Sequence, residues 1–278
     1  MNTNILYIVF AFALFTVSCK KSDQEVNPSL SSAQNNAFAE AQFNDVAMMV
    51  DQAINTGTIT GMAGFSVGSG TNGPSGAPCA FISLDTISLP HKLLIDFGAT
   101  NCVGMDGRSR RGKIMAQFDG RYPDPGTVIS ISFQEYFVNE YRIAGTKQIT
   151  NMGENIAGNP IFKVEVIGSV VKPNGHYFTW NSVRYREWKE GRATPLLPMD
   201  DMYVITGSTN GINTDGTSYS INISKPLIRR LMCNWFEGGA IELLQPGVPK
   251  IAIDFGNTGC DSNATISVRG VSYPLRLE

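Results

Sequence analysis

The chain has 278 residues and a formal net charge of −2 at pH 7, with 42% apolar and 17% charged residues. These values suit one or two ordinary globular domains and give no sign of the basic surface typical of nucleic-acid-binding proteins. The 28 glycines and the many β-branched and aromatic residues favour strands and turns.

Residues 1–18 predict an export signal. The apolar run Ile5–Val17 is too short to span a membrane as a helix and has the size of a signal-peptide core. It ends in TVSC (Thr16–Cys19), which resembles the lipobox of bacterial lipoproteins, although the preceding MNTN lacks lysine and arginine. The resemblance implies that Cys19 is acylated and anchors the mature protein to a membrane. A generic signal peptide with a chance cysteine is the alternative.

Three segments follow this cysteine. Residues 19–36 are polar and without periodicity, and predict a lipid-anchored flexible tether. Residues 37–57 predict an amphipathic helix that ends at Gly57, and residues 58–78, crowded with Gly and Pro, predict a loop. The apolar stripe of the helix recurs at helical spacing and consists of Phe43, Val46, Ala47, Val50 and Ile54.

Residues 79–278 show strands separated by turns. In KIMAQFDG, for example, Ile114, Ala116 and Phe118 alternate with polar or exposed positions. Short connections favour antiparallel neighbours. We therefore predict an all-β domain, an antiparallel meander that forms a sandwich or a long curved sheet, with the N-terminal helix packed on it.

Beyond Cys19, the cysteines are Cys79, Cys102, Cys233 and Cys260, and an even number in an exported chain predicts disulfides with three alternative pairings. The phrase LLIDFGATNC recurs as IAIDFGNTGC, and each copy follows a cysteine 23 or 27 positions upstream, with a turn signal between. A hairpin folded at that turn brings its two ends together. The predicted pairs are therefore Cys79–Cys102 and Cys233–Cys260, with free buried cysteines as the alternative.

The Asp-Phe-Gly in each phrase also occurs in protein kinases. The Gly-rich loop, strand lysine and catalytic loop of a kinase are absent from this sequence, which excludes that interpretation. We predict instead that Asp96 and Asp254 accept hydrogen bonds from nearby backbone amides in turns, since a single carboxylate per site would be a poor calcium ligand.

Several of these features together resemble a group of uncharacterised Bacteroidota lipoproteins. The resemblance rests on the paired C…IDFG…C hairpins and on the segments Ser18–Lys21, Asp106–Arg108, Gly120–Tyr122, Thr179–Ser182 and Tyr203–Ser208. It implies a β-rich protein of the bacterial outer membrane, lipid-anchored and either periplasmic or surface-exposed. It implies no activity.

Signals for catalysis and metal binding are weak. GFSVG (Gly64–Gly68) fits a nucleophile elbow, but the next segment cannot form the required helix, so Ser66 is interpreted as part of a flexible loop. His91 and His176 lie alone in predicted turns, and we predict no catalytic residue, no metal ligand and no cofactor. DGRSRRGK (Asp106–Lys113) is interpreted as a solvated loop, with contact to anionic sugars or lipid headgroups as the alternative.

The segment YFTWNSVRYREWKEG carries the candidate binding surface. On a strand, Trp180, Ser182, Arg184, Arg186 and Trp188 share one face, and Tyr177, Val183 and Tyr185 share the other. One hypothesis is a Trp–Arg cation–π ladder that stabilises a solvent-facing sheet. The other is a binding surface, formed by Trp180, Arg184, Arg186 and Trp188, that stacks on sugar rings or holds a protein partner.

The sequence thus predicts a lipid-anchored cell-envelope protein without a catalytic site that serves as a structural, adhesive or ligand-binding module. Its expected partners are the membrane, through the acyl chains, and a glycan or protein; no nucleic acid is expected. The alternatives are an extracytoplasmic enzyme acting on glycans or peptides and an accessory subunit of an outer-membrane complex. Two carboxylates about 5–10 Å apart in a cleft would favour a glycosidase.

Overall fold

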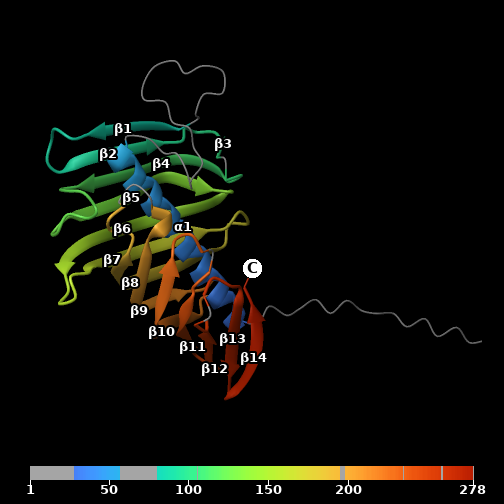
Figure 1. Cartoon of the computed structure of the whole chain (residues 1–278). Helices are drawn as coiled ribbons and strands as arrows, with labels where there is room; N and C mark the ends of the chain where they lie inside the picture. Colours follow the sequence, from blue (N-terminus) through green and yellow to red (C-terminus); the bar gives the residue numbers. More distant parts are fainter. Residues whose placement is uncertain are drawn as a thin grey trace, which may run out of the picture.

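The computed structural model describes residues 28–56, 80–104, 106–194, 198–233, 235–257 and 259–277. Within them, one long helix lies on one face of a single antiparallel sheet of fourteen strands (Figure 1). Each strand pairs with the next along the chain, with one exception. The strand β2 does not pair with β3 but with β4, and the short strand β3 pairs with β4 as well. The predicted all-β meander with an N-terminal helix is confirmed, as one long curved sheet.

The helix α1 spans Pro28–Thr56, and a 3₁₀ turn, η1, spans Pro198–Asp200. The first seven strands are β1 (Phe81–Asp85), β2 (His91–Asp96), β3 (Cys102–Val103), β4 (Ser109–Phe118), β5 (Val128–Val138), β6 (Tyr141–Glu154) and β7 (Pro160–Val171). The other seven are β8 (Tyr177–Glu190), β9 (Met202–Ile212), β10 (Ser218–Arg230), β11 (Gly238–Gln245), β12 (Val248–Asp254), β13 (Asn263–Val268) and β14 (Val271–Arg276).

The prediction of a flexible tether over residues 19–36 is wrong for residues 28–36, which form the first turns of α1. Proline fits the first turn of a helix because its missing amide would have no intrahelical partner there. Ser32, Asn35 and Asn36 are buried, and they bond to polar side chains of the sheet. A buried stripe of serine and asparagine has no apolar periodicity, so the sequence pattern misplaced the start of the helix. Residues 19–27, with Cys19, residues 1–18 and residues 58–78 lie outside the described residues.

The helix runs diagonally across the sheet, from the last strands near β13 to β2 (Figure 1). Its predicted stripe is confirmed, with Phe43, Val46 and Val50 buried and Ala47 and Ile54 partly buried against the core. Phe43 lies over Gly168 of β7, where an added Cβ would come 2.5 Å from the tip of the ring. We call the sheet face under α1 the inner face and the opposite one the outer face.

Glycines inside strands allow the sheet to coil around the helix. Gly145 in β6 and Gly207 in β9 both have φ of +120°, a conformation that side chains disfavour. A Cβ there would lie 2.0 Å from the carbonyl oxygen of Ile167 and 2.1 Å from that of Val183, respectively. Such local distortions bend strands and increase their twist.

The two Asp-Phe-Gly phrases form the same local structure. Asp96 accepts a hydrogen bond from the Gly98 amide at 2.8 Å, and Asp254 accepts one from the Gly256 amide at 2.9 Å. In both copies the phenylalanine is buried and the glycine has a positive φ. The predicted turn role of the two aspartates is confirmed.

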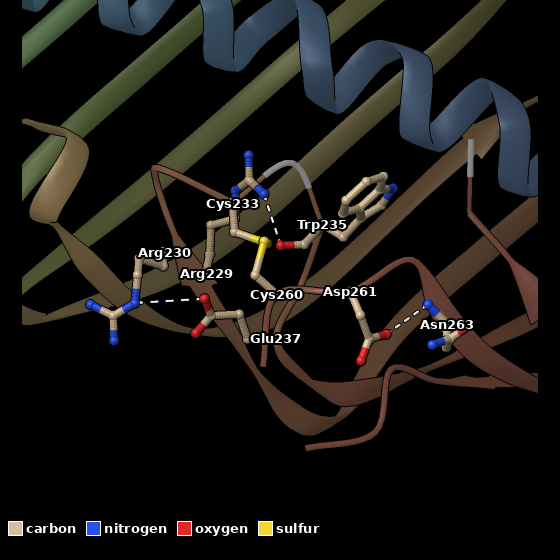
Figure 2. Close-up of a disulfide and its surroundings, with 8 residues drawn as sticks. All are labelled: Arg229, Arg230, Cys233, Trp235, Glu237, Cys260, Asp261 and Asn263. Atoms are coloured by element: carbon tan, nitrogen blue, oxygen red, sulfur yellow. Dashed lines mark hydrogen bonds and ion pairs between the residues drawn. A yellow bond between two sulfur atoms is a disulfide. The ribbon is translucent and has the colours of Figure 1, made fainter. Parts of the chain in front are cut away.

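The C-terminal phrase is closed by the predicted Cys233–Cys260 disulfide, whose Cα atoms lie 5.6 Å apart (Figure 2). The hairpin β11–β12 turns at Pro246-Gly247, between the paired residues Gln245 and Val248, as the turn signal predicts. Cys102 is also disulfide-bonded. Its predicted partner, Cys79, lies outside the described residues, so that pairing stays a prediction.

Candidate functional site

The predicted binding surface on β8 lies on the inner face, under α1. Trp180 is 3% exposed and donates from Nε1 to Asn36 at 2.9 Å, and Trp188 is 4% exposed and donates to Asp201 at 3.0 Å. Trp180 also stacks on Phe43, with ring centroids 5.5 Å apart. The predicted division of β8 into two faces is therefore correct, but the helix covers the face that carries the predicted binding surface.

The two arginines of that surface are covered as well. Arg184 is 3% exposed, and its nearest carboxylate, that of Glu40 on α1, lies 3.8 Å away. Arg186 donates to the side chain of Asn44 at 2.7 Å. Neither a solvent-facing cation–π ladder nor an open sugar platform forms from Trp180, Arg184, Arg186 and Trp188.

A partly exposed row of cationic, aromatic and aliphatic side chains lies on the outer face instead. Strand pairing aligns Arg111 with Phe137, Phe137 with Arg142, Arg142 with Val171 and Val171 with Tyr177. Their chain neighbours Arg110, Val138, Ile143, Val170 and Phe178 are buried on the inner face. Because successive strand residues point to opposite faces, the row itself faces outward.

Arg111, Phe137, Arg142 and Val171 of this row form the floor of an open pocket of about 460 Å³. The β7–β8 turn supplies one wall, closed by the hydrogen bond from the Lys172 amide to the His176 carbonyl. The lining residues are Arg111, Phe137, Glu140, Arg142, Val171, Lys172, Pro173 and Gly175. The volume falls within the range of small-molecule sites, and apolar and charged groups converge in it.

Arg111 is fixed over the aromatic floor. Its guanidinium carbon lies 3.8 Å from the centroid of the Phe137 ring, a cation–π geometry. Its Nη1 also donates to Glu140 at 2.8 Å and to Asn101 at 3.1 Å. Hydrogen bonds from Asn101 and from Arg111 hold the pKa of the Glu140 carboxyl below its ordinary value, so this residue stays ionised.

The pocket carries an excess of positive charge. Arg142 pairs with Glu135 at 2.6 Å and Arg111 pairs with Glu140, whereas Lys172 has no carboxylate within 4 Å among the described residues. The Lys172 ammonium lies 5.6 Å from the centroid of the buried Phe178 ring. Three cations facing two carboxylates leave a net charge of +1, which suits an anionic ligand.

Two carboxylates pair with the arginines of the pocket, and both residues have an unusual backbone conformation. Glu135 has φ of 45° in β5, and Glu140 has φ of 67° in the β5–β6 turn beside Asn139 at 46°. Two successive positive φ values are typical of the tight hairpin turns that glycine and asparagine prefer. A glutamate in that region is strained, and such strain concentrates at functional sites.

The arginine-rich segment predicted as a solvated loop is largely strand β4. Arg110 is fully buried and pairs with Asp45 of α1 and with Asp106, and Arg108 pairs with the same two aspartates. Only Arg111 of this segment lines the outer pocket. The loop interpretation failed because the buried partner, Asp45, is distant in the sequence.

Of the remaining sequence candidates, none that the structure describes contributes a side chain to the pocket lining. Ser66 lies outside the described residues, His176 is exposed in its turn, and the His91 ring bonds to the Ser88 carbonyl at 2.8 Å. In the described part of the chain, Cys233, Glu237 and Cys260 form a group with metal-ligand spacing, but the disulfide holds both sulfurs.

A second titratable cluster lies near the end of α1. Asp201 is 6% exposed and accepts hydrogen bonds from Trp188 and Tyr203. Burial raises the pKa of Asp201 to about 6, against the lowering effect of those bonds, and burial likewise raises that of Asp51 to about 6. No described cation pairs with Asp201, so its charge is poorly compensated at neutral pH.

Comparison with known proteins adds no constraint. No family model matches this chain, and neither a curated protein nor a solved structure matches it. The resemblance to Bacteroidota lipoproteins therefore stays a prediction. Among the described residues, no helix has the length and apolar character needed to cross a membrane.

Sequence reasoning missed the pocket because no local motif encodes it. Arg111, Phe137 and Arg142 lie on three different strands, and only the register of β4, β5 and β6 places them in one row. The sequence contains one usable signal: Phe137 and Arg142 flank Val138–Tyr141, in which the polar pair Asn139-Glu140 separates two strand residues, as in a hairpin turn.

Proposed function

We propose that this protein is a lipid-anchored module of the bacterial cell envelope that binds acidic glycans through the outer-face pocket. One observation carries the proposal: Arg111, Phe137 and Arg142 form a partly exposed row, next to a lysine without a carboxylate partner among the described residues. The anchor at Cys19 and the outer-membrane location rest on the lipobox resemblance.

The chemistry of the pocket matches both parts of an acidic sugar. The exposed ring of Tyr177, at the end of the row beside the pocket, offers a flat apolar surface against which the C–H face of a pyranose can pack, whereas the Phe137 ring supports Arg111. Guanidinium groups present paired donors that fit carboxylate or sulfate oxygens, and Lys172 adds a mobile point charge. An acidic glycan also compensates the excess charge of the pocket.

Binding without catalysis is favoured by the state of the pocket carboxylates. A glycosidase needs one carboxylic acid whose pKa is raised so that it can protonate the leaving group. Glu140 has a lowered pKa, and Glu135 is paired with Arg142. The carboxyls with raised pKa, those of Asp51 and Asp201, do not line the pocket.

A glycan array of acidic and neutral oligosaccharides tests the proposal. The purified protein is expected to bind glycans with uronic acid or sulfate groups and to bind their neutral counterparts at least tenfold more weakly. Arg142→Gln should reduce this binding. Arg121→Gln, at the exposed opposite end of the same strands, should not. Equal binding of neutral and acidic glycans, or no binding at all, would contradict the proposal.

The anchor is tested separately by labelling cells with radioactive palmitate. The protein is expected to take up the label, and a Cys19→Ser variant is expected to lose it. An unlabelled wild-type protein would remove the lipid anchor from the proposal without affecting the pocket.

A further inference from the structure

A second cationic cluster lies between α1 and the inner face, on the opposite side of the sheet from the pocket. It contains Lys147 of β6, Arg184 and Arg186 of β8, and Arg229 of β10. The side chain of Glu40 on α1 interacts electrostatically with Lys147, Arg184 and Arg229. Arg229 also interacts with Glu237, so four basic groups share two carboxylates in a largely buried region.

Arg184 has too few partners for a buried guanidinium. Its side chain is 4% exposed, and one nitrogen, Nη2, lies 3.8 Å from Glu40. The other two, Nε and Nη1, are buried without a hydrogen-bond partner. A buried donor without a partner is costly, and a buried charge without close compensation is more so.

The neighbouring basic groups are bonded to neutral acceptors. Lys147, 1% exposed, donates to the Phe43 carbonyl at 2.9 Å and to Asn44 Oδ1 at 3.3 Å. Arg186 donates to the same Asn44 oxygen, and its Nε is buried without a partner. Burial and the proximity of Arg186 lower the pKa of Lys147, which relieves only part of the charge excess.

Arg229 adds a third guanidinium, which donates to the Trp235 carbonyl at 2.9 Å (Figure 2). With Lys147 neutral, the three arginines and the two carboxylates, Glu40 and Glu237, leave a net charge of +1. The three unpartnered guanidinium nitrogens of this cluster belong to Arg184 and Arg186, which lie two positions apart on the same face of β8.

We propose that Arg184 and Arg186, with Lys147 and Arg229 around them, form a binding site for a small oxyanion, of the phosphate or sulfate class, beneath helix α1. An oxyanion supplies several acceptor oxygens and negative charge. The surroundings of Arg184 and Arg186 have too little of both. Because α1 covers the site and supplies Glu40 and Asn44, the bound anion fastens the helix to the sheet.

Inorganic phosphate is the probe for this site. The wild-type protein is expected to bind phosphate saturably in calorimetry and to show a Tm that rises with phosphate beyond the rise in sodium chloride of equal ionic strength. Arg184→Gln should weaken phosphate binding at least tenfold and abolish the specific Tm rise. Because phosphate stabilises many proteins through exclusion from their surfaces, the comparison with the variant is decisive.

Two further variants separate this site from the outer pocket and guard against misfolding. Arg142→Gln should leave the specific Tm rise intact, since it alters only the outer face. If Arg184→Gln does not fold, Arg186→Gln is the substitute, because Arg186 is less buried. It should also lose phosphate binding and the specific Tm rise. A monoalkyl phosphate distinguishes the source of the anion. It should not bind if the site takes free phosphate, and it should bind if the site takes the phosphate group of a larger molecule.

The proposal is overturned if wild type and Arg184→Gln respond equally to phosphate. It is also overturned if phosphate binding is lost with Arg142→Gln and kept with Arg184→Gln, because the outer pocket would then be the phosphate site.

Discussion

Asp45 on α1 and Arg110 on β4, 65 residues apart in the chain, form a buried ion pair with Oδ2 and Nη2 at 2.9 Å. Arg110 is fully buried, and Asp45 also pairs with Arg108 at 2.7 Å. This contact joins the helix to the first half of the sheet. It also holds β4 in place, and Arg111, the next residue of β4, points to the outer face.

Loss of the Asp45 carboxylate should therefore weaken the whole domain. Asp45→Ala leaves Arg110 with Asp106 as its remaining carboxylate partner in a buried position, and we expect a loss of about 3 kcal/mol in the free energy of unfolding. Urea denaturation measures it. Asp124→Ala, which removes an exposed pair with Arg121, is the matched control, with an expected loss of less than about 1 kcal/mol. Equal effects of the two changes would contradict the proposed role of Asp45.

The contact between Phe43 and Gly168 predicts a size constraint. Gly168→Ala would place a methyl group 2.5 Å from the Phe43 ring, and we expect overpacking to cost about 1–3 kcal/mol. In a Phe43→Leu background the same change should cost less, because the ring tip is gone. A double-mutant cycle measures the coupling, and strictly additive effects would mean that the two residues do not meet.

The stability of the protein should depend on the protonation of Asp201. Its pKa is raised to about 6 in the folded protein, against 3.8 as the ordinary value, so the folded state binds the proton more tightly. The resulting stabilisation is complete below pH 3.8 and is lost as the pH rises through about 6. The shift corresponds to about 3 kcal/mol for this buried group.

Asp201→Asn tests that pH dependence. Asparagine can still accept the Trp188 hydrogen bond but has no charge to bury. The variant should be more stable than wild type at pH 7.5, by about 2 kcal/mol, and should lose this advantage at pH 4. Urea titrations at both pH values measure the difference in the free energy of unfolding between the variant and wild type. The same difference at both pH values would contradict the raised pKa of Asp201.

The Cys233–Cys260 disulfide closes a loop with a sequence separation of 27. Replacing both cysteines with serine should reduce the free energy of unfolding by about 3–4 kcal/mol, mainly by enlarging the unfolded ensemble. Non-reducing peptide mapping should also identify Cys79 as the partner of Cys102. A Cys102 peptide linked to any other cysteine would refute the N-terminal pairing.

Sequence patterns predicted the strands well because alternation is a local property. Ile114, Ala116 and Phe118 are buried as their spacing indicates, and the Asp96 and Asp254 turns form from residues within a few positions. The Cys233–Cys260 pairing was accessible for the same reason, since one hairpin turn brings both ends together.

The candidate site depends on relations that no local pattern contains. The sequence of β8 shows that Trp180 and Val183 face opposite ways but not which of the two faces α1 covers. The helix carries Ser32, Asn36 and Asp45 on its buried side, so its true extent and its polar contacts with the sheet are invisible to a search for apolar periodicity. The outer pocket needs the register of four adjacent strands.

The most direct test of acidic-glycan binding is a residue-resolved NMR titration of the protein with a glucuronate-containing disaccharide. Saturable shifts are expected at Arg111, Phe137, Arg142 and Lys172, with none for the matching neutral disaccharide. Shifts confined to Arg184 and Arg186 under α1, or equal shifts with the neutral sugar, would contradict it.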